Sequence, residues 1–123
     1  MHPNASAPRI LIVDDHASFR RTARALLEER RYNVVGEAAS GGEATRAATR
    51  VALDGVLLDV RLGAENGFVV CAALTRAFPR LSVVLASSCD YGEFSELIDS
   101  SGACGFVLKS QLATTNLARF WPC

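Results

Sequence analysis

The sequence predicts an α/β protein in which helices cover both faces of one parallel sheet. Five short apolar runs alternate with five segments of helical periodicity along the 123 residues. The first run, residues 10–13, is apolar at every position, which suits a central strand buried on both faces. Such alternation implies right-handed crossovers between parallel strands. The length fits a single domain of about 100–150 residues.

Composition excludes several classes of protein. Thirteen Lys and Arg balance thirteen Asp and Glu, and 50% of the residues are apolar. This composition argues against disorder and against a direct nucleic-acid or membrane-surface partner. No apolar run has the roughly 18–20 residues of a membrane span, and residues 1–8 lack the apolar stretch of a signal peptide. The four cysteines show no zinc-binding spacing. We therefore expect a cytoplasmic location.

The N-terminal half is predicted to contain a tail, three strands and two helices. In the first helix, apolar residues recur four, seven and eight positions after Phe19, which places them on one face. Ser40 and Glu43 match a capping box at the start of the second helix. These signals predict a flexible tail at 1–8, strands at 10–13, 33–38 and 55–58, and helices at 17–31 and 40–50.

The C-terminal half is predicted to contain two strands and three helices. Seven consecutive apolar residues from Phe68 suit a strand or a helix, and we expect a helix that ends before Pro79. Gly102 is expected to end the next helix. The predicted strands are 81–86 and 105–108, and the helices are 68–78, 91–100 with Phe94, Leu97 and Ile98 inward, and 111–121 with Ala113, Leu117, Phe120 and Trp121 on one face. We expect no second domain after residue 121.

Polar residues follow four of the five predicted strands. Asp14 and Asp15 follow the first strand, Asp59 the third, Ser87 the fourth and Lys109 the fifth. Sites in open parallel sheets form beyond the carboxyl ends of the strands, so these side chains are candidates for one site. Taken singly, Asp15 could cap the first helix and the others could be turn or surface residues. Their joint position favours a site.

The residue types point to phosphoryl chemistry. Clustered carboxylates repel one another unless a cation joins them, and oxygen ligands with room for water favour Mg²⁺ over Ca²⁺. Lys109 and a serine hydroxyl suggest an anionic ligand such as a phosphoryl group. An aspartate can accept that group covalently. A Mg²⁺-dependent phosphatase is a weaker alternative, because it needs a second acid beside Asp59 and position 61 is arginine.

The segments ILIVDD, GVLLDVRL…NGF about 40 positions later, VVLASS and GACGFVLKS resemble the receiver domain of two-component response regulators. The resemblance covers residues 9–121. GFVLKSQL is especially similar to receivers that precede a LuxR-type helix-turn-helix domain. The resemblance implies a flavodoxin-like, doubly wound five-stranded sheet with strand order 2-1-3-4-5 and five helices.

The resemblance also implies roles for the site residues. Asp59 would be the phosphoacceptor, and a sensor histidine kinase would supply the phosphate. Asp15 would bind Mg²⁺ directly and Asp14 through water, with the main-chain carbonyl of Arg61 as a further ligand. The phosphoryl oxygens would be held by Ser87 and Lys109.

Signalling would follow from the same site without an enzymatic activity of the chain itself. Ser87 would turn toward the phosphoryl group and couple to Phe106, which replaces a common tyrosine. The fourth helix, fifth strand and fifth helix would then contact a downstream protein or a second copy in a homodimer. Ser110 stands where many relatives have a proline, so we expect a trans bond after Lys109.

The sequence supports two hypotheses about the whole protein. The chain is either a stand-alone phosphoacceptor that acts by protein–protein contact or the receiver portion of a DNA-binding transcription regulator. No helix-turn-helix segment lies in the sequence itself, and the reading frame beyond Cys123 would distinguish the two.

Overall fold

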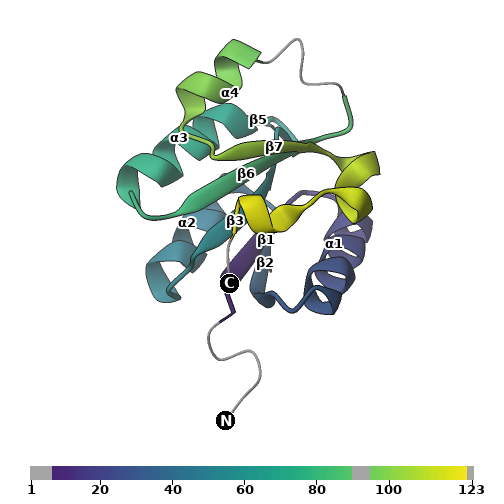
Figure 1. The fold of residues 1–123 in the computed structure, drawn as a ribbon. Helices are drawn as coiled ribbons and strands as arrows, with labels where there is room; N and C mark the ends of the chain where they lie inside the picture. Colours follow the sequence, from purple (N-terminus) through teal and green to yellow (C-terminus); the bar gives the residue numbers. More distant parts are fainter. Residues whose placement is uncertain (1–6, 90–94, 122–123) are drawn as a thin grey trace.

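The computed structural model describes residues 7–89 and 95–121. Its centre is a parallel sheet whose strands are β1 (Arg9–Val13), β2 (Asn33–Ala38), β3 (Gly55–Asp59), β6 (Ser82–Ser87) and β7 (Gly105–Leu108). The spatial order is β2-β1-β3-β6-β7 (Figure 1). Counted along the chain, this is the order 2-1-3-4-5, so the predicted flavodoxin-like, doubly wound sheet is confirmed.

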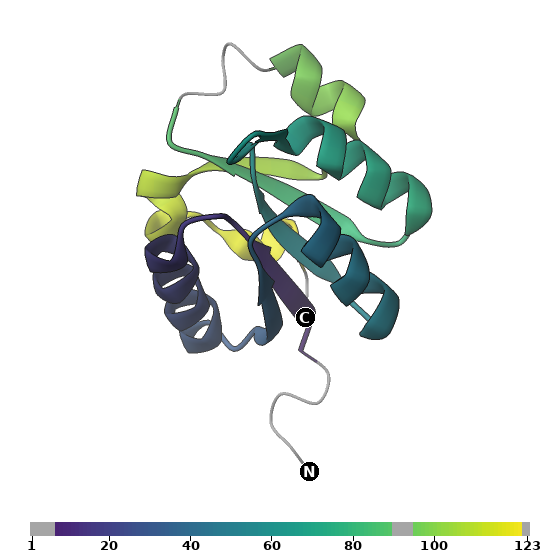
Figure 2. The same cartoon turned by 180° about the vertical axis from the view of Figure 1, so that it is seen from behind.

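Helices cover both faces of the sheet. They are α1 (Ala17–Glu29), α2 (Gly41–Arg50), α3 (Gly67–Ala77) and, within the described part, α4 (Ser95–Ser101). The sheet separates α1 and the C-terminal segment from α2 and α3 in both views (Figures 1 and 2). Among the described residues, no helix combines the length and apolar character needed to span a membrane.

Side-chain caps begin two of these helices where the sequence predicts. Ser40 Oγ accepts a hydrogen bond from the Glu43 N–H at 3.2 Å, and Glu43 Oε1 accepts one from the Ala39 N–H. Asn66 Oδ1 accepts from the Phe68 N–H at 2.8 Å and begins α3. The predicted capping box is confirmed, with the glutamate bond displaced by one residue.

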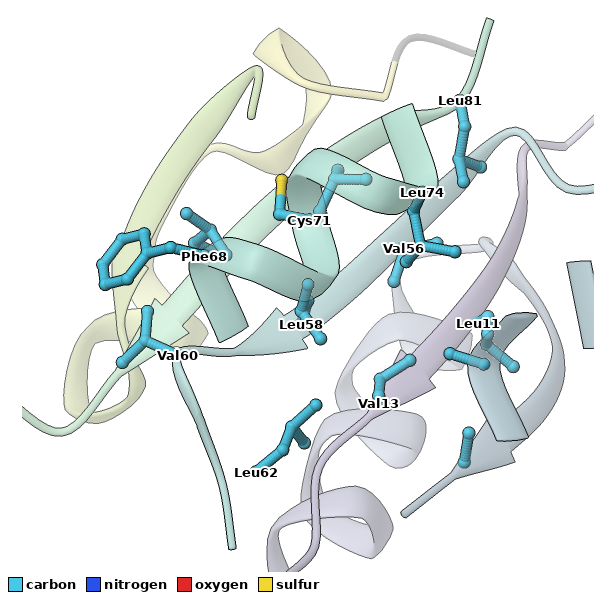
Figure 3. Close-up of a cluster of buried hydrophobic side chains, with 14 residues drawn as sticks. Leu11, Val13, Val56, Leu58, Val60, Leu62, Phe68, Cys71, Leu74 and Leu81 are labelled. Atoms are coloured by element: carbon cyan, nitrogen blue, oxygen red, sulfur yellow. The ribbon is translucent and has the colours of Figure 1, made fainter. Parts of the chain in front are cut away.

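The core consists of two layers, one on each face of the sheet. Leu11 and Val13 point toward α2 and α3, whereas Ile10 and Ile12 point toward α1, and all four are at most 1% exposed. Figure 3 shows the first layer, in which Leu58 of β3 lies near α3. Burial on both faces explains why the strand sequences are apolar without alternation.

The predicted continuous helix at 111–121 is wrong. Two 3₁₀ helices, η2 (Lys109–Thr114) and η3 (Leu117–Arg119), occupy the segment. The Thr115 hydroxyl bonds the Gln111 carbonyl, and the Asn116 side chain accepts from the Ala118 N–H. Such local bonds compete with helix propagation. The Arg30 guanidinium also binds carbonyls of this segment, those of Thr115 and Ala113.

The inward face of this segment differs in part from the prediction. Leu117 and Trp121 are buried as expected, and Phe120 is half-buried, but Leu112 is buried in place of Ala113. The Trp121 indole donates a hydrogen bond to the Ser82 carbonyl at 3.0 Å and contacts Tyr32 edge-on at 5.8 Å between ring centroids. The tryptophan therefore ties the end of the chain to the sheet.

Other expectations have mixed outcomes. The predicted start of the fourth helix and Phe94 lie outside the described residues, as does most of the predicted tail at 1–8. Within α4, Ile98 packs against the core, but Leu97 is 47% exposed and the prediction that it points inward is wrong. Gly102 ends the helix with a φ of +84°, as predicted.

No peptide bond of the described residues is cis, so the bond after Lys109 is trans as expected.

The turn after β3 contains a small hairpin that the sequence did not predict. Strands β4 (Arg61–Leu62) and β5 (Glu65–Asn66) pair antiparallel across Gly63, whose φ is +60°. Glu65 Oε1 accepts a hydrogen bond from the Gly41 N–H, which joins the hairpin to the start of α2. The hairpin thereby fixes the chain immediately after Asp59.

Candidate metal and phosphoryl site

The sheet brings Asp14, Asp59 and Lys109 to one face of its carboxyl edge. Ile12, Leu57 and Val107 pack in the core layer under α1. Asp14, Asp59 and Lys109 each lie two residues beyond one of them. Since side chains two apart on a strand share a face, the three groups converge. The sequence-based expectation that strand ends form one site is met for these residues.

Lys109 joins the two buried aspartates. Its Nζ lies 2.6 Å from Asp14 Oδ2 and 3.2 Å from Asp59 Oδ2. Asp14 is fully buried and Asp59 is 5% exposed. The ammonium also lies 4.4 Å from the centroid of the Phe19 ring on α1. One cation therefore offsets the repulsion of two carboxylates that water barely reaches.

The electrostatics of Asp59 reflect this enclosure. Burial raises the pKa of Asp59, and the neighbouring charge of Asp14 raises it further, against the lowering effects of the Arg61 N–H and Lys109. The Arg61 N–H donates to Asp59 Oδ1 at 3.2 Å. One carboxylate oxygen thus contacts the backbone and the other faces Lys109.

Asp15 and His16 extend the cluster toward solvent. His16 Nδ1 lies 3.2 Å from Asp14 Oδ1 and 3.1 Å from Asp15 Oδ1, and the His16 N–H donates to Asp14 Oδ1 at 2.8 Å. Both residues are exposed. His16 is not among the site residues predicted from the sequence, although its position directly after the two aspartates is a signal that could have identified it.

Ser87 and Phe106 lie on the other face of the sheet edge. Ser87 is two residues beyond Leu85, which packs toward α3 and pairs with Phe106 in register. The Ser87 hydroxyl accepts a hydrogen bond from the Cys89 N–H at 3.0 Å, and Ser87 is 3% exposed. Phe106 packs against the same core layer. The two proposed switch residues therefore share a face, while their roles stay predictions.

The acidic cluster can hold a metal ion. One ligand atom each from Asp14, Asp15, His16 and Asp59 lies within 4.8 Å of the others. Asp14 Oδ2 is buried, and its partner among the described residues is the Lys109 ammonium at 2.6 Å. The cluster contains three carboxylates, two of which share that single ammonium, and carboxylate oxygens are ligands that Mg²⁺ takes, so the donor set fits a divalent metal. Arg61 follows Asp59 by two residues at the start of β4, and the role of its carbonyl stays a prediction.

The chain matches the response regulator receiver domain family over residues 10–118, and it belongs to that family. It is 33% identical to response regulator GacA of Pseudomonas viridiflava over 102 residues, which are 82% of this chain and 48% of the relative. Identity to the nitrate/nitrite response regulator protein NarP of Escherichia coli K12 is 32%, over 87% of this chain and 50% of NarP. The chain spans about half the length of these curated relatives.

Solved structures agree. A two-component response regulator of the LuxR family from Aurantimonas sp. SI85-9A1 superposes with a TM-score of 0.82 at 30% identity, covering 88% of this chain and 78% of that one. A CheY-like receiver domain protein from Methanospirillum hungatei superposes with a TM-score of 0.74 at 23% identity, covering 84% and 82%, and supports the fold alone. The chain is a receiver domain of the two-component response regulators.

Proposed function

We propose that Asp59 accepts a phosphoryl group from the phosphohistidine of a sensor histidine kinase. The observation that carries the proposal is the position of Lys109, whose Nζ contacts both Asp59 and the neighbouring Asp14. In the reaction the P–N bond breaks while an Asp59 oxygen bonds to phosphorus. Lys109 then stabilises the negative charge of the phosphoryl oxygens as a point charge.

We propose Mg²⁺ as the metal, held by Asp15 directly, by Asp14 through water and by the Arg61 carbonyl and Asp59. The ion, when bound, neutralises charge on the phosphoryl oxygens. Asp14 and Lys109 contribute opposite charges that already lie beside Asp59 before any ligand arrives, because both side chains are largely buried there. Phosphoryl transfer needs chiefly this positioning and charge neutralisation.

The output is proposed to begin at Ser87. Its hydroxyl would leave the Cys89 N–H and bind a phosphoryl oxygen, which changes the packing next to Phe106. Support comes from the location of both residues on one sheet face. The downstream partner would bind the surface of α4, β7 and the C-terminal segment, or a second copy would form a homodimer there.

We further propose that residues 9–121 act as one receiver unit in the cytoplasm, as a phosphoacceptor without catalytic turnover of its own. A second candidate is the receiver portion of a DNA-binding transcription regulator. The LuxR-family neighbour and the twofold greater length of the curated relatives favour it. The genomic reading frame beyond Cys123 distinguishes the two candidates.

The acceptor assignment is tested with acetyl phosphate and Mg²⁺. The wild-type protein and Asp99→Asn should gain one acid-labile phosphoryl mass, because Asp99 is an exposed residue of α4 away from the site. Asp59→Asn should gain none. An equal mass gain in Asp59→Asn would refute the assignment.

A further inference from the structure

We propose that His16 is an imidazole ligand of the acidic cluster, so that the site binds a first-row transition-metal dication more tightly than Mg²⁺. The inference rests on the proposed metal site and specifies which ions it takes. Carboxylate oxygens suit Mg²⁺, whereas an imidazole nitrogen favours ions such as Co²⁺ and Ni²⁺. A single histidine among three aspartates therefore changes the selectivity of the site.

The ring nitrogen lies where a further ligand of a metal would stand. His16 Nδ1 is 3.1 Å from Asp15 Oδ1 and 3.2 Å from Asp14 Oδ1. Neighbouring donor atoms around an octahedral ion with bonds of about 2.1 Å are about 3 Å apart. The His16 nitrogen has about this separation from the oxygen of Asp15, the carboxylate proposed to bind the ion directly, before any ion binds.

Helix capping does not explain the position of His16. The residue is the N-cap of α1, with an extended backbone, but its side chain makes no capping hydrogen bond. Its backbone N–H instead donates to Asp14 Oδ1 at 2.8 Å, which fixes the residue beside the cluster. The ring is thus directed at the carboxylates rather than at the helix end.

A second observation points to a cation independently of the histidine. Lys109 is the single lysine of the chain, and its ammonium pairs with both buried aspartates, at 2.6 Å from Asp14 and 3.2 Å from Asp59. Two buried carboxylates therefore share one ammonium, and a further cation would reduce their mutual repulsion. The exposed side of the cluster is the His16 side, since that side chain is 66% exposed, and an ion can enter from solvent there.

A simpler explanation is that the His16 ring only donates a hydrogen bond to the aspartates, as its 3.2 Å contact with Asp14 Oδ1 allows. The two explanations differ in a measurable way. A hydrogen-bond donor leaves the cluster when a metal binds and contributes no nitrogen to it, whereas a ligand stays bonded to the metal.

The test uses untagged protein loaded with Mn²⁺ for pulsed EPR and titrated with Co²⁺ and Mg²⁺ for affinity. The control variant is His2→Ala, since His2 is the only other histidine of the chain. Wild type and His2→Ala should show ¹⁴N coupling to Mn²⁺ and a strong preference for Co²⁺. In His16→Ala the coupling should vanish and the ratio of Co²⁺ to Mg²⁺ affinity should fall about tenfold or more. His16→Asn should behave like His16→Ala.

Persisting ¹⁴N coupling in His16→Ala, or an unchanged affinity ratio in both His16 variants, would overturn the inference. Phosphorylation of Asp59 in Mg²⁺ separates this failure from that of the proposed function. Wild type that is phosphorylated but shows no ¹⁴N coupling refutes the histidine ligand alone. Wild type that binds no ion refutes both.

Discussion

Replacing Trp121 by alanine should lower the free energy of unfolding by about 4–6 kcal/mol. The indole is 2% exposed, and loss of a buried aromatic ring in favour of alanine costs about 3–5 kcal/mol. The substitution also removes the 3.0 Å hydrogen bond to the Ser82 carbonyl, worth about 1 kcal/mol. A Cβ on Gly55 would collide with the same indole, so the ring packs directly on the β3 backbone.

Urea unfolding followed by circular dichroism measures this loss, because the substitution removes the chain's single tryptophan fluorophore. Trp121→Phe keeps a ring beside Tyr32 but loses the hydrogen bond, so it should lose only about 1–2 kcal/mol. Gln111→Ala, at an exposed position, should change stability by less than about 0.5 kcal/mol. A loss below about 1.5 kcal/mol in Trp121→Ala would refute the role of the indole in holding the C-terminal segment.

Three further substitutions probe the site. Because burial first, and the charge of Asp14 second, raise the pKa of Asp59, the folded protein binds this proton more tightly than the unfolded chain does. Ionisation of Asp59 therefore costs stability once the pH exceeds the unfolded pKa of about 4. Asp59→Asn should accordingly gain stability over wild type as the pH rises from about 3 to about 7. A difference in melting temperature between the two proteins that is constant with pH would contradict this. Lys109→Met leaves the two buried carboxylates without their ammonium partner. Its free energy of unfolding should fall by about 3 kcal/mol without Mg²⁺ and recover in part when Mg²⁺ is added. If calorimetry shows that Mg²⁺ stabilises the variant and the wild type equally, the result would count against the ion pair. A Cβ on Gly67 would overlap the Asp59 carbonyl, so Gly67→Ala should slow phosphorylation by acetyl phosphate. Gly42→Ala on α2, where a Cβ would make only ordinary van der Waals contacts, should not slow it. Equal rates in the two variants would exclude the Gly67 backbone contact as a constraint.

The central strands and the meeting of Asp14, Asp59 and Lys109 could be predicted from the sequence. A strand buried on both faces needs an unbroken apolar run, and such runs are short and bounded by polar residues. Parallel topology then places the residues after the strands at one edge. Both inferences depend on local sequence and a general rule of topology.

The C-terminal segment could not be predicted in the same way. Its apolar spacing favours a helix, but the Arg30 guanidinium, from the end of α1, binds the carbonyls of Ala113 and Thr115. Besides the local bonds of Thr115 and Asn116, this contact joins residues more than 80 positions apart, and no local pattern reveals that part of the competition. The exposure of Leu97 likewise depends on how α4 lies against α3, and periodicity does not determine which apolar face is covered.

Asp14 and Lys109, on the two sides of Asp59, differ in how many contacts hold them in place. The Asp14 carbonyl accepts a hydrogen bond from Arg20 at 2.6 Å, and Arg20 pairs with Glu37 of β2, which Arg24 holds as well. A chain of contacts thus anchors the Asp14 side to the far edge of the sheet. Lys109 has ion pairs and the Phe19 ring as its side-chain contacts. We therefore expect a change of charge on Asp59 to displace Lys109 and the segment that follows it more than Asp14.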